Sequence, residues 1–390
     1  MSSRFDFDSI VDRRNSGSYK WDDYSGDPDD MIQLWVADMD FRTAPAIIEA
    51  LRRRVDHGVF GYTFVPNMYY AALTDWFRRR HGYNIDRSKV IYTSGVVPAM
   101  SAVIKALTVP GEGVILNTPA YNCFFSSIRN NGCRIVESPL RRIDLDGGEF
   151  TYEIDFEALD SLASHPDNKL FILCNPHNPT GRVWRHDELE RIAEICSRNG
   201  VRVISDEIHC ELTLPGTEYL PYGNIDGRAV ICNAPSKAFN TAGLQIANIV
   251  CPDDETRAKI DKAININEVC DVNPFGVAGL IAAYNEGEEW LDDLRIYLEG
   301  NYRLIKSFFA DKLSSYPIAR LEATYLAWVD ITASKLDSDE IENLLADKAH
   351  VRVASGSIYG DKRYIRINFA TPRTLISEAL HRIEPILNSL

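Results

Sequence analysis

The sequence lacks the features that would direct it to a membrane or to nucleic acid. It has no apolar run of the about 18 residues that a transmembrane helix needs, and residues 1–15 lack the apolar core of a signal peptide. Positive charge is in deficit, because 42 Lys and Arg stand against 56 Asp and Glu and give a net charge of -14. A phosphate backbone or an anionic membrane would be repelled on average. We therefore expect a cytoplasmic protein that binds neither nucleic acid nor membrane.

Paired cysteine motifs are also missing. Eight cysteines are present, but no two of them form a CxxC pattern, and most lie far apart within apolar segments. This distribution is typical of reduced core cysteines. His209 and Cys210 follow Asp206 and Glu207, yet adjacent strand residues point to opposite faces, and the usual ligand spacing of a metal site is absent. We expect no metal.

Two common phosphate-binding motifs are absent as well. There is no GxxxxGK[ST], no GxGxxG after a strand, and no GxSxG context for a catalytic serine. We find no internal repeat and no linker of Gly and Ser. The 390 residues, of which 45% are hydrophobic and 25% charged, are enough for one large domain and a smaller one.

Apolar strands alternate with amphipathic helices from Pro66 onward. The pattern predicts helices ending near 80, starting at 98 and 121, and at 155–164 and 185–199, with strands at 90–93, 114–116, 133–137, 169–174, 201–205 and 229–233. Such alternation indicates a mainly parallel sheet covered on both faces. The apolar run 246–251 follows too closely for a helical crossover, so this strand is predicted to be antiparallel.

The two ends of the chain differ from this alternating part. Residues 1–42 are polar and aromatic with little periodicity, which is typical of an extended arm. Thr43 is expected to cap a helix that carries Pro45 in its first turn and ends at Gly58. After Pro252 the chain is predicted to be helical, with a long helix at 288–312, strands near 325–330 and 364–369, and a closing helix from 372.

A single lysine follows one of the predicted buried strands. The apolar run 229–232 leads into a small polar turn in which Lys237 is flanked by Ser236 and Phe239. On this segment alone, a solvated surface lysine is as good an explanation as a reactive one.

Three other strands carry polar groups at the same edge of the sheet. Residues 94–97 lead into a helix whose free N–H groups suit a phosphate, although on this segment alone a tight strand-to-helix turn explains the single glycine better. The segment CNPHNPTG presents Asn178 from an irregular loop, and Asp206 follows the strand VRVIS directly. A carboxylate at the end of a buried strand needs a cationic or hydrogen-bonding partner. Ligands of open parallel sheets bind at this edge.

A phosphate site, an asparagine, a carboxylate and a lysine at one edge meet the requirements of pyridoxal phosphate. A lysine forms its Schiff base, a helix N-terminus suits its phosphate, and a carboxylate keeps its pyridine nitrogen protonated so that the ring accepts electrons. No other common cofactor uses all four groups. We expect pyridoxal 5'-phosphate as the cofactor.

Seven segments carry a resemblance to a known family: WVADMDF (35–41), GYT (61–63), GVVPA (95–99), CNPHNPTGRVW (174–184), ISDEIH (204–209), SKAFNTAGLQ (236–245) and RINFATP (366–372). With them the chain resembles, over nearly its whole length, the fold-type I pyridoxal-phosphate enzymes of the aspartate aminotransferase superfamily. WVADMDF, GVVPA and DEIH favour the C–S lyase group, which includes bacterial cystathionine β-lyases.

The resemblance implies an α/β fold. A large domain with a mainly parallel seven-stranded sheet between helices would be joined to a smaller α+β domain. Residues 1–48 would form an N-terminal arm and part of the small domain, 49–286 the large cofactor-binding domain, and 287–390 the small C-terminal domain.

The resemblance also implies which residues hold the cofactor ring. Lys237 would form the Schiff base and Asp206 would hold the pyridine nitrogen. Asn178 would hydrogen-bond the ring oxygen, with His209 standing where many aminotransferases have a tyrosine. Tyr121 would stack on the ring.

The phosphate and the substrate have implied partners of their own. The backbone N–H groups of Val96 and Val97 and the Ser236 hydroxyl would hold the phosphate. Tyr62 would reach it from the partner subunit of a homodimer, although from the pattern alone its loop, FGYTFVP, is more simply a packing segment. Arg366 would clamp the substrate α-carboxylate.

Two positions depart from the family pattern. Gln245 stands where many aminotransferases have an arginine, and Ala234 stands where a serine is common. Both changes remove phosphate contacts. The first agrees with the lyase group, which often lacks that arginine.

The implied reaction is β-elimination from a sulfur amino acid such as cystathionine to a thiol, pyruvate and ammonia. Lys237, Tyr121 and Asp206 would be its catalytic residues, with Lys237 moving the Cα proton. An aminotransferase would use the same residues. A non-catalytic regulatory protein on this scaffold is a third possibility, against which the intact Lys237, Asp206 and Arg366 argue.

Overall fold

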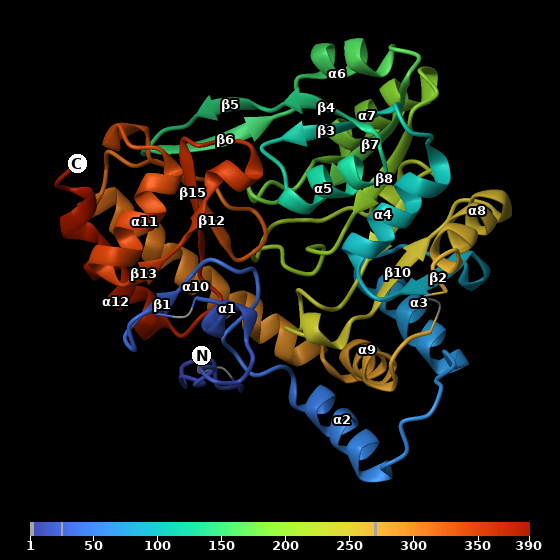
Figure 1. The fold of residues 1–390 in the computed structure, drawn as a ribbon, viewed down its shortest axis with the longest axis horizontal. Helices are drawn as coiled ribbons and strands as arrows, with labels where there is room; N and C mark the ends of the chain where they lie inside the picture. The colour runs from blue at the N-terminus through green and yellow to red at the C-terminus, as the bar shows by residue number, and fades with distance from the viewer. Residues whose placement is uncertain (1–3, 25, 269–270) are drawn as a thin grey trace.

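The fold is built around two β-sheets, one in each half of the molecule (Figure 1). The computed structural model describes residues 4–24, 26–268 and 271–390. Seven strands form the first sheet, in the order β2-β10-β9-β8-β7-β3-β4, and six form the second, in the order β14-β15-β12-β11-β6-β5. A separate short pair joins β1 (Ile32–Gln33) to β13 (Val351–Arg352), so the N-terminal region pairs with the C-terminal part of the chain.

The first sheet has the predicted topology. Its strands are β2 (Val90–Thr93), β3 (Gly113–Thr118), β4 (Arg134–Pro139), β7 (Asn168–Cys174), β8 (Arg202–Asp206), β9 (Val230–Asn233) and β10 (Ala247–Val250). β10 pairs with β2 and β9 in antiparallel fashion, while β4, β3, β7, β8 and β9 are parallel. This confirms the mainly parallel seven-stranded sheet of an α/β fold. The antiparallel strand is also confirmed, because the connection after β9 is too short for a helical crossover.

Helices cover both faces of this sheet. The helices of this half are α2 (Pro45–His57), which packs on α9 away from the strands (Figure 1), α3 (Asn67–His81), α4 (Val96–Leu107), α5 (Asn122–Asn130), α6 (Phe156–Ala163), α7 (His186–Arg198), α8 (Asp254–Asn265) and α9 (Pro274–Glu286). Neighbouring strand residues belong to different cores: Val203 packs with Leu189 of α7, whereas Ile204 packs with Val103 of α4. The alternation of side chains along a strand thus explains why these strands are apolar throughout.

The second sheet combines distant parts of the chain. It contains β5 (Arg141–Asp144), β6 (Glu149–Glu153), β11 (Ile318–Ala319), β12 (Leu326–Asp330), β14 (Ala354–Ser355) and β15 (Tyr364–Asn368), with α10 (Glu288–Lys312), α11 (Ser338–Ala349) and α12 (Arg373–Leu387) in the same half (Figure 1). The long helix at 288–312 is confirmed. The β5–β6 hairpin, which the sequence did not predict, comes from the middle of the chain and joins through β6 and β11.

The predicted cap of α2 is wrong. Ala44 is the N-cap residue and makes no side-chain cap, whereas the Thr43 hydroxyl donates to the Phe239 carbonyl at 2.6 Å. Pro45 at the first helical position has no N–H to satisfy and already has a helical φ, so the helix can start without a cap from Thr43. The threonine instead ties the start of α2 to the loop that carries Lys237.

Cysteine pairing and membrane insertion find no support in the described residues. Seven cysteines are free thiols and six of them are buried; Cys270 lies outside the described residues. None of the helices within the described ranges has both the length and the apolar character needed to cross a bilayer.

A segment of the N-terminal arm, residues 35–41, is tied to the preceding part of the arm by a buried ion cluster. The fully buried Lys20 donates to Asp40 at 2.8 Å, and Arg13 forms ion pairs with Asp40 at 2.8 Å and Asp38 at 2.7 Å. The Trp21 indole also donates to Asp40, at 2.9 Å. Burial acts to raise the pKa of Asp40, but these partners, Lys20 above all, hold it below its usual value. We call residues 35–41 the strap.

Asp40→Asn should strongly destabilise the protein. The substitution removes the nearer carboxylate of the buried Lys20 ammonium and leaves only Asp38, at 3.8 Å; breaking a buried pair costs about 3–5 kcal/mol in comparable cases. Denaturant unfolding measures the change. Asp12→Asn is the matched control, because Asp12 pairs with Arg14 at the surface of the same arm, and it should leave the unfolding midpoint unchanged. Equal effects of the two substitutions would contradict the role assigned to the cluster.

Candidate active site

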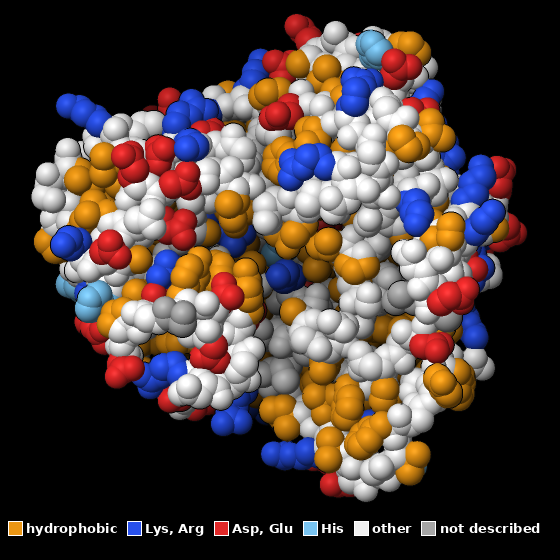
Figure 2. Space-filling model, in the orientation of Figure 1, with side chains coloured by type: hydrophobic (Ala, Val, Ile, Leu, Met, Phe, Trp, Pro, Cys, Tyr) orange, Lys and Arg blue, Asp and Glu red, His pale blue; other side chains and the backbone are white. Residues whose placement is uncertain are grey.

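A cavity of about 180 Å³ lies where the carboxyl ends of several strands of the first sheet meet. Figure 2 shows basic side chains in the hollow between the two halves of the molecule. The residues that line the cavity include most of those singled out in the sequence: Val96, Val97, Tyr121, Asn178, Asp206, His209, Ser236 and Lys237. The structure therefore brings eight of the ten predicted site residues together around one space.

Lys237 lies in the loop after β9, and its amine is held by the strap. Its Nζ donates to the Ala37 carbonyl at 2.6 Å. Desolvation, followed by the positive charge of Arg366, lowers the pKa of Lys237 to about 8, against the opposing effect of Asp38 and Asp206. A neutral amine, which is the nucleophilic and basic form, is therefore accessible near neutral pH.

Asp206 is the last residue of β8 and is buried. Its Oδ1 accepts a hydrogen bond from the Ile208 N–H at 3.0 Å, and no described residue forms an ion pair with it. Burial raises the pKa of Asp206 to about 6, although the Ile208 N–H and the Lys237 charge act to lower it. A cation bound in the cavity would stabilise the ionised carboxylate.

Arg366 reaches the site from β15 of the second sheet. The side chain is buried, and its two terminal nitrogens donate to the Asn178 side-chain oxygen at 3.2 Å and to the Trp35 carbonyl at 2.9 Å. Its Nε has no hydrogen-bond partner. Arg366 does not line the cavity itself, but its contact with Asn178 ties it to the lining. Both of its partners are neutral, so donors and charge remain available for an anion.

The N-terminus of α4 forms another part of the cavity wall. Gly95 is the N-cap residue and provides no side-chain cap, so the N–H groups of the first turn, including those of Val96 and Val97, face the site without a helical partner. The Ser94 and Ser236 side chains line the same space. A helix N-terminus with adjacent hydroxyls is suited to a phosphate group.

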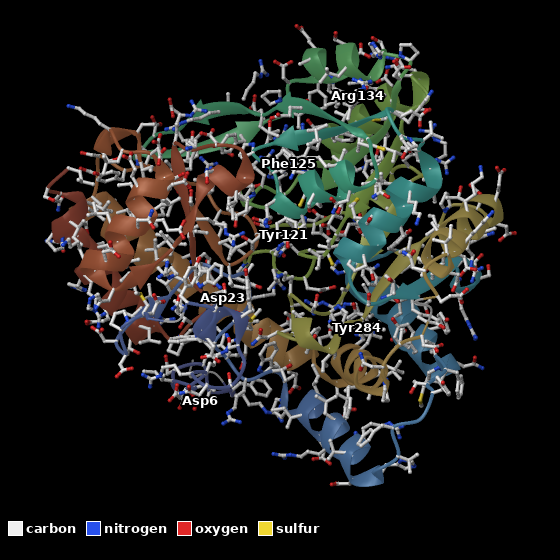
Figure 3. The ribbon with its side chains drawn as sticks, in the orientation of Figure 1. Asp6, Asp23, Tyr121, Phe125, Arg134 and Tyr284 are labelled. Carbon is white, nitrogen blue, oxygen red and sulfur yellow. The ribbon has the colours of Figure 1, made fainter. Side chains whose placement is uncertain are left out.

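His209 and Tyr121 complete the lining as neutral side chains. His209 is buried, its Nδ1 lacks a partner, and burial, followed by the charges of Lys237 and Arg366, lowers its pKa well below the usual range. Tyr121 is the N-cap of α5 and lies near the middle of the molecule (Figure 3). Burial holds the pKa of its phenol well above the usual value.

Tyr62 is the predicted site residue that lies away from the cavity. It is 101% exposed, and Phe60 and Phe64 beside it are also exposed. The simpler expectation, that its loop is a packing segment of this chain, fails for the exposed Tyr62 and Phe64, whereas Phe60 contacts the Phe275 ring at 5.7 Å and Val65 packs against the core. Together with Val55, Val59 and Met68, the exposed side chains of Tyr62, Phe60 and Phe64 form an apolar surface around the end of α2 (Figure 2).

Sequence reasoning missed the part that the strap has in the site. The carbonyls of Trp35 and Ala37 accept hydrogen bonds from Arg366 and Lys237, and the buried Tyr325 hydroxyl also donates to Ala37, at 3.0 Å. The segment WVADMDF was a visible signal of the C–S lyase group, but structurally it was predicted only to be part of an extended arm. Backbone carbonyls leave no trace in residue identity, so their role could not be derived.

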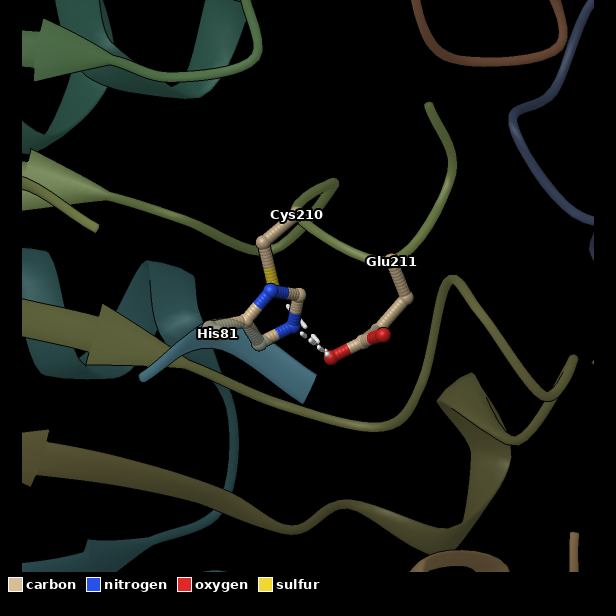
Figure 4. Close-up of side chains that lie close together, drawn as sticks. All are labelled: His81, Cys210 and Glu211. Atoms are coloured by element: carbon tan, nitrogen blue, oxygen red, sulfur yellow. Dashed lines mark hydrogen bonds and ion pairs between the residues drawn. The ribbon is translucent and has the colours of Figure 1, made fainter. Parts of the chain in front are cut away.

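A second cluster, formed by His81, Cys210 and Glu211, has its potential ligand atoms within 4.8 Å of one another (Figure 4). Glu211 is already committed, because its oxygens accept from His81 at 2.6 Å, the Trp76 indole at 2.7 Å and Arg80 at 3.2 Å. Burial acts to raise the pKa of Glu211, but His81 and Arg80 lower it to about 2. We interpret the cluster as a closed ion-pair network.

Comparison with known proteins agrees with this geometry. Residues 29–383 match the family model described as aminotransferase class I and II. The chain belongs to this family. Since the match covers most of the 390 residues, both sheets and the cavity between them are included.

Within the family, the chain is similar to several proteins named as lyases. It is 37% identical to cystathionine beta-lyase PatB of Bacillus subtilis, with 98% of this chain and 100% of the relative covered. The solved structure of cystalysin from Treponema denticola, which contains a pyridoxal 5'-phosphate cofactor, has a TM-score of 0.94 and 34% identity, with 99% of each chain covered. The C–S lyase from Staphylococcus hominis, solved in its PLP-bound form, has a TM-score of 0.90 and 31% identity, with 98% of this chain and 99% of the other covered.

Lys237 of the cofactor-free protein should react with amine reagents with a midpoint near pH 8. Below this pH the amine is protonated and unreactive, and above it the neutral form predominates, as follows from its lowered pKa. Labelling followed by mass spectrometry of the peptide that contains Lys237 measures the midpoint.

Arg366→Gln should move this midpoint upward, because Arg366 is one of the charges that lower the pKa of Lys237. Arg363→Gln is the control, since Arg363 lies near the start of the same strand but is exposed and pairs with Asp361. A wild-type midpoint near the ordinary lysine value of about 10.4 would contradict the assigned environment.

Proposed function

We propose that the protein is a pyridoxal-phosphate-dependent C–S lyase that cleaves cystathionine or related S-substituted cysteines to a thiol, pyruvate and ammonia. The observation that carries the proposal is that Lys237, an amine with a lowered pKa, shares one cavity with Asp206, a buried carboxylate that forms no ion pair with the described residues. The names of the relatives, which include a cystathionine beta-lyase and C–S lyases, support the reaction class.

The groups around the cavity fit the proposed cofactor. Asp206 offers a carboxylate to a pyridinium nitrogen, and the Asn178 and His209 side chains are neutral polar groups suited to a ring oxygen. The first turn of α4 with Ser236 would hold the phosphate. Tyr121 would stack on the ring. Gln245 also lines the cavity and adds no positive charge, so the phosphate would depend mainly on hydrogen bonds.

Pyridoxal phosphate, when bound, supplies an electron sink for the bond that is broken at the substrate Cα. In our proposal Lys237 would hold the cofactor covalently, and its amine, when free, would remove the Cα proton of the substrate. The electrons of the Cα–H bond form a Cα–Cβ double bond as the Cβ–S bond breaks, and the sulfur leaves as a thiolate. Addition of water to the remaining three-carbon fragment gives pyruvate and ammonia.

Arg366 would orient the substrate during this step. Its guanidinium has free donors, and it can bind the α-carboxylate in a bidentate way. The Ala37 carbonyl accepts a hydrogen bond from the Lys237 amine and would limit where the free amine can move. Asp206 would keep its negative charge once it faces a cation.

This proposal assigns different parts of the site to different domains. Residues 49–286 would form the cofactor-binding domain, since all residues proposed to hold the cofactor lie in that range. Residues 287–390 would form the small domain, which supplies Arg366, and residues 1–48 the arm and part of the small domain.

An aminotransferase reaction is the second candidate, because the matching family model is that of aminotransferases. It would use Lys237, Asp206 and Arg366 in the same roles and transfer the amino group to a keto acid. Incubation with cystathionine separates the two reactions. Transfer to a keto acid without release of thiol or pyruvate would overturn the lyase proposal.

We further propose a cytoplasmic homodimer. The exposed apolar surface that includes Tyr62, Phe60 and Phe64 is suited to burial against a second copy of the chain, and Tyr62 would reach the phosphate of the partner's site. The active sites would then be shared between subunits.

Lys237→Ala should abolish pyruvate and thiol formation from cystathionine while leaving the fold intact. The substitution removes the amine that binds the cofactor and moves the proton, and the loop that carries it is anchored independently by the Thr43 and Asn240 hydrogen bonds. Pyruvate release and thermal unfolding are measured in parallel. Retained turnover would remove the central assignment.

Mixing two inactive variants should restore activity if the sites are shared. A Tyr62→Ala subunit contributes Lys237, a Lys237→Ala subunit contributes Tyr62, and a hybrid dimer then holds one intact site. Mixing Lys237→Ala with Lys237→Arg is the control and should restore none. If the hybrid is no more active than the sum of its parents while the dimer exchanges subunits, the role of Tyr62 across the interface is wrong.

A further inference from the structure

Arg366 differs from the other buried arginines in how its charge is balanced. The similarly buried Arg182 forms a two-pronged pair with Glu188 at 2.8 Å and a further pair with Glu322 at 2.7 Å. Arg352, at the limit of burial, pairs with Asp27. Arg366, 3% exposed, forms no ion pair with any described residue. A buried guanidinium without a counter-ion is unfavourable unless something else stabilises its charge.

The Tyr359 ring supplies that stabilisation. The guanidinium carbon of Arg366 lies 4.6 Å from the ring centre, within the range of a cation–π contact. The face of an aromatic ring is electronegative and attracts a guanidinium that lies over it. The Nε–H of Arg366 keeps no hydrogen-bond partner beside the ring. An aromatic platform thus stabilises the charge without occupying donors that a substrate carboxylate needs.

Tyr359 is itself fixed on two sides. It lies in the short helix η5 (Gly356–Tyr359), is 1% exposed, and its ring meets the Trp328 ring edge-on at 5.7 Å. Its carbonyl accepts the Ala120 N–H at 2.9 Å, directly before Tyr121. The platform is therefore connected to the first sheet through the segment that carries Tyr121, and to the second through Trp328 of β12.

We propose that Tyr359 is a positioning residue for the substrate carboxylate: its ring holds the Arg366 guanidinium flat, charged and free of a competing carboxylate. This proposal rests on the proposed role of Arg366 as the carboxylate clamp. Neutral acceptors, Asn178 and Trp35, fix two corners of the guanidinium, and the ring fixes its plane. Loss of the ring leaves space into which the side chain can tilt, so the bidentate geometry is lost.

The test compares two ligands that differ only in the carboxylate. L-Alanine and ethylamine both present an amine, and neither has a leaving group at Cβ, so binding can be followed by the absorbance of the cofactor in the holoenzyme without β-elimination. Tyr359→Leu should weaken alanine binding about 10-fold, in the range of a desolvated cation–π contact, and leave ethylamine binding unchanged. Tyr359→Phe keeps the ring and should match the wild type for both ligands.

A fluorinated ring keeps the test decisive if Tyr359→Leu fails to fold. Trifluorinated phenylalanine at position 359 has nearly the same shape but a less negative face, and it should weaken alanine binding relative to phenylalanine while thermal unfolding stays unchanged. If the leucine and fluorinated variants bind alanine as the wild type does, or if ethylamine binding falls equally, the proposal is wrong.

Arg366→Gln separates this failure from that of the proposed function. If it abolishes the preference for alanine over ethylamine while Tyr359 variants do not, Arg366 binds the carboxylate as proposed and only the positioning role of Tyr359 is wrong. If it leaves the preference intact, Arg366 does not bind the carboxylate, and the positioning role proposed for Tyr359 is then wrong as well. Absence of pyruvate release from cystathionine would overturn the lyase reaction but would leave both binding results readable.

Discussion

Two cations in the cleft, Lys237 and Arg366, are held by neutral acceptors, so their positive charge is not balanced by a carboxylate. The binding properties of the rest of the site depend on this unbalanced charge. Each cation donates to a carbonyl of the strap, and neither forms an ion pair among the described residues. Burial of unpaired charge is costly, so a ligand that brings anionic groups gains binding free energy from both. A substrate carboxylate and a cofactor phosphate are such groups. The free donors at the start of α4 add to the same demand for negative charge.

Hydrogen bonds from other parts of the chain fix the position of the strap, and with it the position of the carbonyls that bind Lys237 and Arg366. Asn368 donates to the carbonyls of Val36 and Asp38, on either side of Ala37, and Asn240 binds the backbone of Met39. Lys20 and Arg13 neutralise the acidic side chains of the strap. The strap carboxylates are therefore paired within the N-terminal arm, while the Ala37 and Trp35 carbonyls bind Lys237 and Arg366. A segment distant in sequence thus sets the position of both reactive side chains.

Much of the site was predictable because the loops at the ends of parallel strands must meet. Asp206 directly follows an apolar run, and Lys237 lies in the turn after another, so the topology of the sheet alone brings them together. The β5–β6 hairpin was not predictable in the same way, since its partner β11 lies more than a hundred residues further along the chain. The Thr43 cap failed because a tertiary contact with Phe239 replaced the local one. Tyr359 carried no signal, because a ring that supports an arginine resembles any core tyrosine.

Buried charge separates the structural parts of this molecule from its reactive part. In the Arg182 and Glu211 networks the charged groups pair with opposite ones, and these networks link residues far apart in the sequence. In the cleft the same residue types are arranged to stay incomplete: Asp206 has a backbone donor but no cation, and Arg366 has a ring but no carboxylate. A counter-ion supplied by the chain itself, for example a glutamate beside Arg366, would pair the unbalanced charge in the cleft and stabilise the protein without ligand. It would also remove the differential interaction that binding requires, because the guanidinium would exchange one carboxylate for another. The incomplete pairing is therefore what leaves this cleft free to bind an anionic ligand.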